Sequence, residues 1–423
     1  MGIFDKFWKR DVKGSMGEEK QGEMKAPVKP AGEPYRIRDR IAGKYEIHRI
    51  LGGEGKSGMG IVYVCYDHEF KQVLALKTFQ DRYLSSKEMK DSFKKEALLW
   101  THLERYPYIV RAEWVQELDY RMFVACEFIA PDDEGRNTLT HYLMSPISLK
   151  QSLIWAIQFC HGMEHASSRG VTPHRDIKPD NIMITRDGVL KIADFGLAGL
   201  WHKAGMADGL KRHQDEGGKG FTFIKMAGER IAVGTPPWMP PEQFDGNADT
   251  RSDIYSFGIV MYQMLTNGKL PFEPSKGDDW KKAHKTYPVP SLQTNSSLSL
   301  RATDSPLTKG DRGLLSRGEA ISKLSSMIER CLKKNPEERY RGFDELRGGV
   351  EGLFTNITGE PPPPPPNPVK LEAGELNNKG FSLANLGLFD EAIRSYREAI
   401  RIKPDYAGAH TTTLGMPFMT KDL

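Results

Sequence analysis

The residues best suited to chemistry lie in two short runs, HRDIKPDN at 174–181 and DFG at 194–196. In the first run, the carboxylate of Asp176 can accept the hydrogen bond of an attacking hydroxyl and later its proton. Lys178 follows two residues later, so its ammonium can reach a phosphate group held over the same loop. The spacing therefore places a base and a cation on one short segment.

Asn181 and Asp194 add oxygen atoms of the kind that bind magnesium. Mg²⁺ is a hard cation that proteins hold through a few side-chain oxygens, while substrate phosphates and water complete its shell. Phosphoryl transfer from ATP needs an oriented nucleophile and several charges gathered around the triphosphate. An isolated HxD would be weak evidence for phosphoryl transfer. The complete runs HRDIKPDN and DFG, in this order, are specific evidence for it.

These runs resemble the catalytic signature of the protein kinase family, over about residues 45–350. The resemblance implies an α+β protein with the two-lobed kinase fold. It also implies ATP and Mg²⁺ as cofactors, and transfer of the γ-phosphate to serine or threonine hydroxyls of protein substrates. Lys178 together with Thr235 is typical of the serine/threonine branch, here of the eukaryotic-like, bacterial Hanks type. The catalytic residues implied are Asp176, Lys178, Asn181, Asp194 and Thr235, with Asn181 and Asp194 as metal ligands.

Two other functions stay open at this point. One is an inactive kinase-fold scaffold, which only an altered glycine loop favours. The other is a small-molecule or lipid kinase of related fold. The segment GTPPWMPPE at 234–242 argues against the second, because its family counterpart shapes a platform for a peptide substrate. A radiolabelled-ATP assay on a basic protein distinguishes the first from an active kinase.

Glycines are concentrated between the first two predicted strands, where backbone amides can approach phosphates without a clash from Cβ. In the family pattern G-x-G-x-x-G-x-V, Gly55 and Gly60 match. Ser57 takes the place of the middle glycine, with Gly58 beside it. An ordinary hairpin turn is the alternative. The nucleotide contacts implied here are Leu51, Gly55, Ser57, Gly58, Gly60 and Val62.

Lys77 ends the run VLALK and resembles the strand lysine that binds the α- and β-phosphates. Glu96, on the helical pattern that follows, resembles its ion-pair partner. The strand pattern RMFVACEFI at 121–129 resembles the segment that joins the two lobes and lines the adenine pocket. The pocket residues implied by the resemblance are Ala75, Cys126, Glu127, Ile129 and Met183.

Three charged residues amid apolar helical patterns resemble structural supports of the same family. Glu242 is expected to pair with Arg339 in a buried ion pair, because an unpaired buried charge is costly. Asp253 is expected to hold the backbone around His174 and Arg175.

Regulation by phosphorylation of the segment between Asp194 and Glu242 is a further expectation. Arg175, directly before Asp176, can hold a phosphate group there, and Thr222 is a candidate acceptor. The basic, glycine-rich insert at about 203–225 is either a substrate-docking element or a loop. A second irregular stretch covers 273–316, and its role stays open.

The elements that must position these residues change type along the chain. Short β-branched and aromatic runs predict strands at 44–51, 60–67, 72–79 and 121–129, with a helix at 89–106 between them. Helical patterns dominate later, at 148–170, 252–268 and 321–335. Strands followed by helices predict a small sheet-rich lobe and a larger helical lobe.

The predicted domain division follows from these patterns. Residues 1–43 are a flexible N-terminal segment, and 44–354 form the kinase domain, with a small lobe at about 44–129 and a large lobe at about 130–354. Residues 355–370 form a proline-rich linker; the six prolines at 361–366 predict a stiff polyproline II spacer, with an SH3-type ligand as the alternative. Residues beyond about 361 are expected to be dispensable for chemistry.

Residues 371–423 resemble a tetratricopeptide-repeat unit and its tail. Counting from Ala373, the signature positions are occupied by Leu376, Gly380, Leu383, Ala392, Tyr396, Ala399 and Pro404. One such unit cannot bury its own apolar face. It is therefore expected to pack on the kinase domain, to self-associate, or to be the remnant of a longer array that binds a protein partner.

The amino-acid composition bears on possible partners and on the location of the protein. The 60 basic and 56 acidic residues leave a net charge of +4, too small to predict a nucleic-acid partner. The four cysteines lie far apart without a CxxC pair, which fits a reducing, cytoplasmic location. No apolar run is long enough to predict a membrane-spanning segment. Residues 1–10 could form a short amphipathic helix at a membrane surface, although a frayed terminus is the simpler interpretation.

Overall fold

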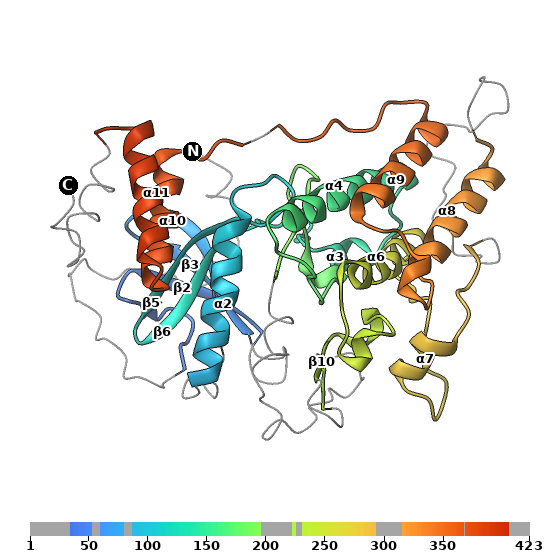
Figure 1. The fold of residues 1–423 in the computed structure, drawn as a ribbon, viewed down its shortest axis with the longest axis horizontal. Coiled ribbons are helices and arrows are strands. Elements are labelled where there is room, and N and C mark those ends of the chain that lie inside the picture. Colours follow the sequence, from blue (N-terminus) through green and yellow to red (C-terminus); the bar gives the residue numbers. More distant parts are fainter. Residues whose placement is uncertain are drawn as a thin grey trace.

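The computed structural model describes residues 34–52, 60–79, 87–195, 222–225, 231–292, 315–367 and 369–405. Within these ranges the chain forms a sheet-rich lobe, a helical lobe and a C-terminal helical hairpin (Figure 1). The first two correspond to the small and large lobes that the sequence predicts. None of the described helices is long and apolar enough to cross a membrane.

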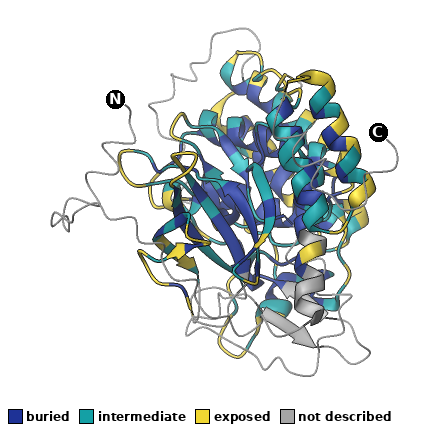
Figure 2. Cartoon of the chain, turned by 90° about the vertical axis from the view of Figure 1, so that its left-hand side faces the viewer, coloured by how far each residue is buried: buried dark blue, intermediate teal, exposed yellow. Residues whose placement is uncertain are grey.

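The small lobe is built on a six-stranded antiparallel sheet with the order β1-β2-β3-β4-β6-β5. Helix α2 (Lys87–Leu103) packs on this sheet. Buried residues of the sheet form a continuous layer (Figure 2). The strands are β1 (Arg40–Ile41), β2 (Tyr45–Gly52), β3 (Gly60–Asp67), β4 (Gln72–Phe79), β5 (Ala112–Leu118) and β6 (Arg121–Glu127).

Alternation along β4 explains how one strand serves two cores. Leu74 and Leu76 face the outer cluster of the small lobe, while Ala75 packs against the main core shared with the large lobe. Successive side chains of a strand point to opposite faces, so Lys77 shares the Ala75 face. The strand thereby aims Lys77 toward the large lobe.

The small lobe differs from the sequence prediction at its edges. β1 and β5 were missed, because β1 has only two residues and β5, AEWVQEL, carries acidic residues between its apolar ones. Part of the segment predicted to be flexible also contacts the lobe: Tyr35 is buried, and its hydroxyl donates to Asp119 Oδ2 at 2.8 Å. The helix predicted at 89–106 ends at Leu103.

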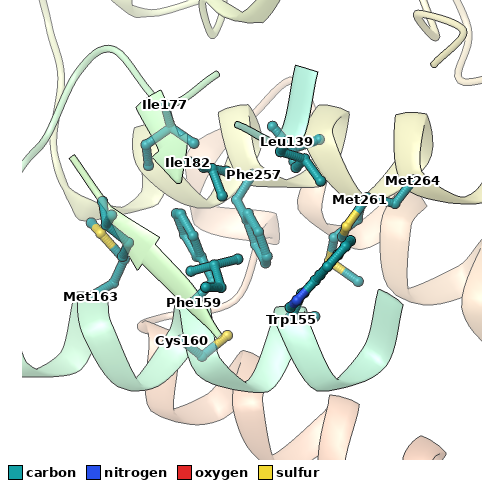
Figure 3. Close-up of a cluster of buried hydrophobic side chains, with 14 of the residues drawn as sticks. Leu139, Trp155, Phe159, Cys160, Met163, Ile177, Ile182, Phe257, Met261 and Met264 are labelled. Atoms are coloured by element: carbon teal, nitrogen blue, oxygen red, sulfur yellow. The ribbon is translucent and has the colours of Figure 1, made fainter. Parts of the chain in front are cut away.

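The large lobe is mainly helical. Helices α4 and α6 form its centre, where the rings of Phe159 and Phe257 stack 3.8 Å apart (Figure 3). Side chains that accept backbone N–H bonds begin both helices, Ser148 for α4 and Asp249 for α6. The helices are α3 (Leu139–Tyr142), α4 (Leu149–Ser168), α6 (Thr250–Leu265), α7 (Trp280–Thr286), α8 (Arg317–Cys331) and α9 (Phe343–Thr358).

Two short antiparallel strand pairs flank the site in the large lobe. The pair β7 (Ile182–Ile184) and β8 (Leu190–Ile192) separates the two catalytic runs, which brings residues 174–181 close to Asp194 and Phe195. The pair β9 (Thr222–Lys225) and β10 (Ile231–Gly234) lies in the segment between Asp194 and Glu242.

The C-terminal hairpin lies against the small lobe rather than beside the large one. Its helices are α10 (Ala373–Asn385) and α11 (Phe389–Ile402), and α10 packs along β5. The proline-rich stretch crosses from the end of α9 to the start of α10 (Figure 1). Because α9 continues to Thr358, this linker begins four residues later than the predicted 355. Of the three possibilities that the sequence left open, the hairpin packs on the rest of the chain.

Candidate active site

Three side chains form a closed hydrogen-bonded triangle in the large lobe. The Thr235 hydroxyl donates to Asp176 Oδ1 at 2.6 Å, and Lys178 Nζ donates to Thr235 Oγ1 at 2.8 Å. Lys178 Nζ also lies 2.8 Å from Asp176 Oδ2. The sequence separates Thr235 from Asp176 by dozens of residues, and the fold brings them into direct contact. A carboxylate held from two sides has a fixed orientation.

Electrostatics keep this pair ionised. Burial alone would raise the pKa of the Asp176 carboxyl. The adjacent ammonium of Lys178 and the hydroxyl of Thr235 outweigh burial, so the pKa of Asp176 lies below its ordinary value. Burial likewise opposes the charge on Lys178, but Asp176 raises the pKa of that lysine overall. Asp176 is therefore available as a proton acceptor at neutral pH.

The backbone around Asp176 is held by contacts from other elements. Asp253, in α6, accepts the N–H groups of His174 and Arg175 at 2.7 and 2.9 Å, as predicted from the sequence. Arg175 has a φ of 68°, in the left-handed region that a non-glycine residue adopts at a cost. Its carbonyl accepts a bond from Gln243 Nε2 at 2.8 Å. Bonds on both sides of Arg175 thus stabilise the turn that presents Asp176.

Asn181 directly precedes β7, and Asp194 lies two residues after the end of β8, so both lie at the open end of this strand pair. The amide nitrogen of Asn181 donates to the carbonyl of Asp176 at 2.8 Å and to its Oδ2 at 3.1 Å. Because the nitrogen is committed to Asp176, the amide oxygen is the Asn181 atom left for a cation. An amide oxygen and a carboxylate fit magnesium, which takes its remaining ligands from phosphates and water. The donor chemistry therefore fits the metal that the sequence implies.

Lys77 meets Asp194 between the lobes. Lys77 Nζ lies 3.1 Å from Asp194 Oδ1, and the lysine is buried although it carries a charge. Glu96 lies in α2, but its side chain is outside the described part of the chain, so the predicted Lys77–Glu96 pair stays a prediction. The same holds for Gly55, Ser57 and Gly58, which fall within the undescribed residues 53–59.

The described ends of the glycine segment are positioned by β2 and β3. Leu51 is exposed in β2 and pairs with Val62 of β3. Val62 in turn lies opposite Lys77 of β4, and a Cβ at Gly60 would lie 3.9 Å from Cε of Lys77. These residues therefore surround the predicted phosphate-binding lysine.

The residues predicted to line the adenine pocket lie on strands of both lobes. Ala75 pairs with Cys126 across β4 and β6, and Met183 lies in β7 of the other lobe. The Glu127 carboxylate accepts from Lys191 Nζ at 2.7 Å and from the Arg111 N–H at 2.8 Å. It is committed to these partners, so contacts of Glu127 with a base would use its backbone. Ile129 is buried next to it.

Phe195 connects Asp194 to the small-lobe helix. It is fully buried, and its ring meets Trp100 of α2 edge-on with centroids 6.1 Å apart. The His174 ring lies 4.8 Å away on another side, and His174 Nε2 bonds the carbonyl of Ala193 at 2.9 Å. Sequence reasoning missed Trp100 and His174 as supports. For Trp100, the only sequence signal was its place on the predicted buried face of α2. No sequence pattern predicted Lys191 as the partner of the Glu127 carboxylate.

Glu242 and Arg339 form the buried pair that the sequence predicts. Arg339 Nη1 and Nη2 donate to the two carboxylate oxygens at 2.7 and 2.9 Å. Arg339 also donates to the carbonyls of Lys333 and Arg251, and its guanidinium lies over the ring of Tyr255. The pair fixes residues 234–242 to the helical lobe.

The two-lobed fold and the assembled loop define a class of phosphotransferase, and comparisons give the family. Residues 45–346 match the family model described as protein kinase domain, so the chain belongs to the protein kinase family. It is 30% identical over 322 residues to serine/threonine-protein kinase PrkC of Bacillus subtilis, covering 75% of this chain and 42% of that protein. It is 27% identical to serine/threonine-protein kinase PknD of Protochlamydia amoebophila, covering 73% of this chain and 30% of that one.

The chain thus spans less than half the length of these relatives. The solved kinase domain of PknI from Mycobacterium tuberculosis matches with a TM-score of 0.50 and 17% identity. That match covers 76% of this chain and 99% of the solved domain, and it shows the fold.

Proposed function

We propose that the protein is an active serine/threonine protein kinase that transfers the γ-phosphate of Mg-ATP to hydroxyls of protein substrates. The observation that carries the proposal is the triangle of Asp176, Lys178 and Thr235 beside Asn181. It places an ionised base, a half-buried cation and an amide oxygen within one hydrogen-bonded group. An inactive scaffold would not need this fully charged arrangement.

In this mechanism Asp176 accepts the hydrogen bond of the substrate hydroxyl and orients its oxygen toward the γ-phosphorus. A bond forms from that oxygen to phosphorus, the bond to the ADP oxygen breaks, and the hydroxyl proton passes to Asp176. Lys178 balances negative charge on the transferred group. Thr235 holds both side chains in register.

The small lobe contributes Lys77, which we assign to the α- and β-phosphates. Asn181 and Asp194 are the proposed ligands of Mg²⁺, whose charge offsets that of the triphosphate when it is bound. The predicted pocket residues Ala75, Cys126, Ile129 and Met183 supply an apolar lining for adenine. The positions of Lys77 and Asp194 on opposite lobes support closure around the nucleotide.

We also propose regulation by phosphorylation of residues 194–242. Arg175 is half-buried beside the catalytic loop, and burial lowers the pKa of its guanidinium, so a phosphate partner would relieve a real cost. Thr222 lies in β9, but its side chain is outside the described residues. Phosphopeptide mapping after incubation with Mg-ATP tests Thr222, and an unmodified Thr222 in fully active enzyme would exclude it.

The hairpin supports the proposal of a tetratricopeptide-type unit. A Cβ at Gly380 would lie 2.7 Å from the Tyr396 ring, so glycine permits the two helices to approach. Ala392 and Ala399 are fully buried in the same interface. The four cysteines are unpaired and buried, in keeping with the proposed cytoplasmic location.

The direct test of the proposed function is transfer of radiolabel from ATP to a generic basic protein. We expect incorporation by the wild type that depends on added Mg²⁺. Asp176→Asn retains the size of the side chain but removes the base, and we expect its rate to fall by at least ~10²-fold. Equal incorporation by both proteins would exclude Asp176 as the base, and none by the wild type would favour the scaffold.

A further inference from the structure

The C-terminal hairpin meets the small lobe at a specific, partly buried seam. At its centre lies Ser382 of α10, which is 1% exposed. Its hydroxyl accepts the Val115 N–H at 2.9 Å and donates to the carbonyl of Asn378 at 2.7 Å. Val115 lies in β5, an edge strand whose N–H groups would otherwise lack strand partners on one side. The hydroxyl therefore satisfies a buried donor of the sheet.

Charged residues surround this contact and tie it to α2 and its C-terminal end. Lys379 Nζ lies 2.7 Å from Glu104 Oε1, and Arg105 Nη1 lies 3.3 Å from Glu375 Oε1. Glu104 also binds Arg169, at the end of α4 in the large lobe, at 2.8 Å. Glu104 therefore joins the hairpin, α2 and the large lobe at one point.

The same part of α2 reaches the catalytic run on its other side. Leu98 packs against the apolar cluster of the hairpin, and Trp100, two residues later, packs edge-on against Phe195. Phe195 directly follows Asp194, which binds Lys77. One helical segment thus contacts the hairpin through Leu98 and the catalytic run through Trp100. Figure 1 shows α2 beside α10 and α11.

We propose that the hairpin is an intramolecular brace that positions α2, with Ser382 as the positioning residue that seats it. The inference rests on the proposed kinase function. It replaces the expectation that residues beyond about 361 are dispensable for chemistry. A released hairpin leaves Leu98 and the Val115 N–H without their partners, so α2 loses support next to Trp100. Phe195 and Asp194 then lose their fixed position.

The test uses the full chain with Ser382→Leu, which removes the hydroxyl and adds bulk at a buried position. Ser382→Thr keeps the hydroxyl and serves as the conservative rescue. Arg397→Leu, on the exposed face of α11, is the control for a changed hairpin surface. Amide hydrogen exchange reports on α10, β5 and α2, while steady-state kinetics report kcat and the KM for ATP.

We expect Ser382→Leu to increase exchange in both α10 and α2 and to lower kcat by about tenfold, with a smaller change in the KM for ATP. Ser382→Thr and Arg397→Leu are expected to behave like the wild type. The split between kcat and KM distinguishes misplacement of the catalytic run from a general loss of folded protein, which circular dichroism also checks.

Three results would overturn the brace. Increased exchange in α10 with unchanged exchange in α2 would show that the hairpin does not support the helix. Increased exchange in both with unchanged kcat would remove the link to catalysis. Unchanged exchange in α10 would show that Ser382 does not seat the hairpin. If the wild type itself transfers no phosphate, the proposed function fails, while the exchange data still decide whether the hairpin supports α2.

Discussion

The large lobe keeps its decisive ion pair in the interior, whereas the hairpin meets the small lobe through pairs at the surface. Arg339 and Glu242 have side chains that are 0% and 17% exposed; those of Lys379 and Glu104 are 24% and 20% exposed. The N–O distances are the same, 2.7 Å in each case. Arg339 also binds the second carboxylate oxygen of Glu242, and the cost of losing one partner is larger for this buried pair.

This difference has a physical cause and a functional consequence. Breaking a buried pair leaves a charge that water cannot reach, whereas surface charges exchange their partner for water. The described part of the hairpin seam has a buried hydrogen bond and a partly exposed charged rim, so we expect it to open at a lower free-energy cost than the large lobe. The large lobe therefore holds the catalytic loop, whereas the hairpin seam is the contact that we expect to change more easily.

The largest effect is expected from Arg339→Met, which leaves Glu242 buried without its partner. We expect the free energy of unfolding to fall by about 3–5 kcal/mol. Arg251→Met, which breaks more exposed pairs with Asp249 and Glu337 in the same lobe, is the matched control and should cost less than about 1 kcal/mol. Urea denaturation measures both. Similar values for the two variants would contradict the comparison.

The contact between the lobes should matter for rate rather than stability. Lys77→Met and Asp194→Asn are each expected to lower turnover by at least ~10²-fold, because each removes charge stabilisation at the phosphates. The reasons differ: higher Mg²⁺ should partly restore Asp194→Asn but not Lys77→Met. Asp187→Asn, in the exposed β7–β8 turn, is the control. Near-normal turnover in either site variant would overturn the assignment.

The free energy of unfolding should depend on pH through a buried histidine of the large lobe. Burial, followed by the nearby charge of Lys334, lowers the pKa of His284 to about 3. The unfolded chain binds the proton more readily, so this contribution to stability is present above about pH 6.5 and is lost as the pH falls toward 3. At pH 4.5 the loss is about 2–3 kcal/mol.

His284→Gln removes this titration. Its unfolding free energy, measured in urea from pH 7.5 to 4.5, should decline less steeply than that of the wild type. Comparing each protein with itself across pH cancels the cost of the substitution at neutral pH. Parallel curves for the two proteins would show that His284 does not contribute to acid sensitivity.

The smallest effect is expected at the rim of the seam. Lys379→Ala should lower the unfolding free energy by less than about 1 kcal/mol, because the pair with Glu104 is partly exposed. The effect should shrink further at high salt, which screens such pairs. Thermal unfolding at low and high salt measures both. A loss comparable to that of Arg339→Met would show that the seam is as fixed as the large lobe.

Much of the candidate site could be predicted from the sequence because several of its residues are close together in the chain. Asp176, Lys178 and Asn181 sit on one loop, so their spacing alone brings them together. Residues predicted by resemblance, such as Asp253, also lie where expected. The adenine-side residues were predicted by the same resemblance, and the strand register of the structure places two of them, Ala75 and Cys126, opposite each other.

The sequence by itself thus determined the chemistry, because catalytic groups within a few residues of one another need little more than a turn. Only the tertiary structure decided which distant groups support them. The Trp100–Phe195 contact, the commitment of Glu127 to Lys191 and the docking of Ser382 on Val115 join segments far apart in the chain. No local pattern encodes such pairs, since each forms only when whole helices and strands pack and bury the same surface.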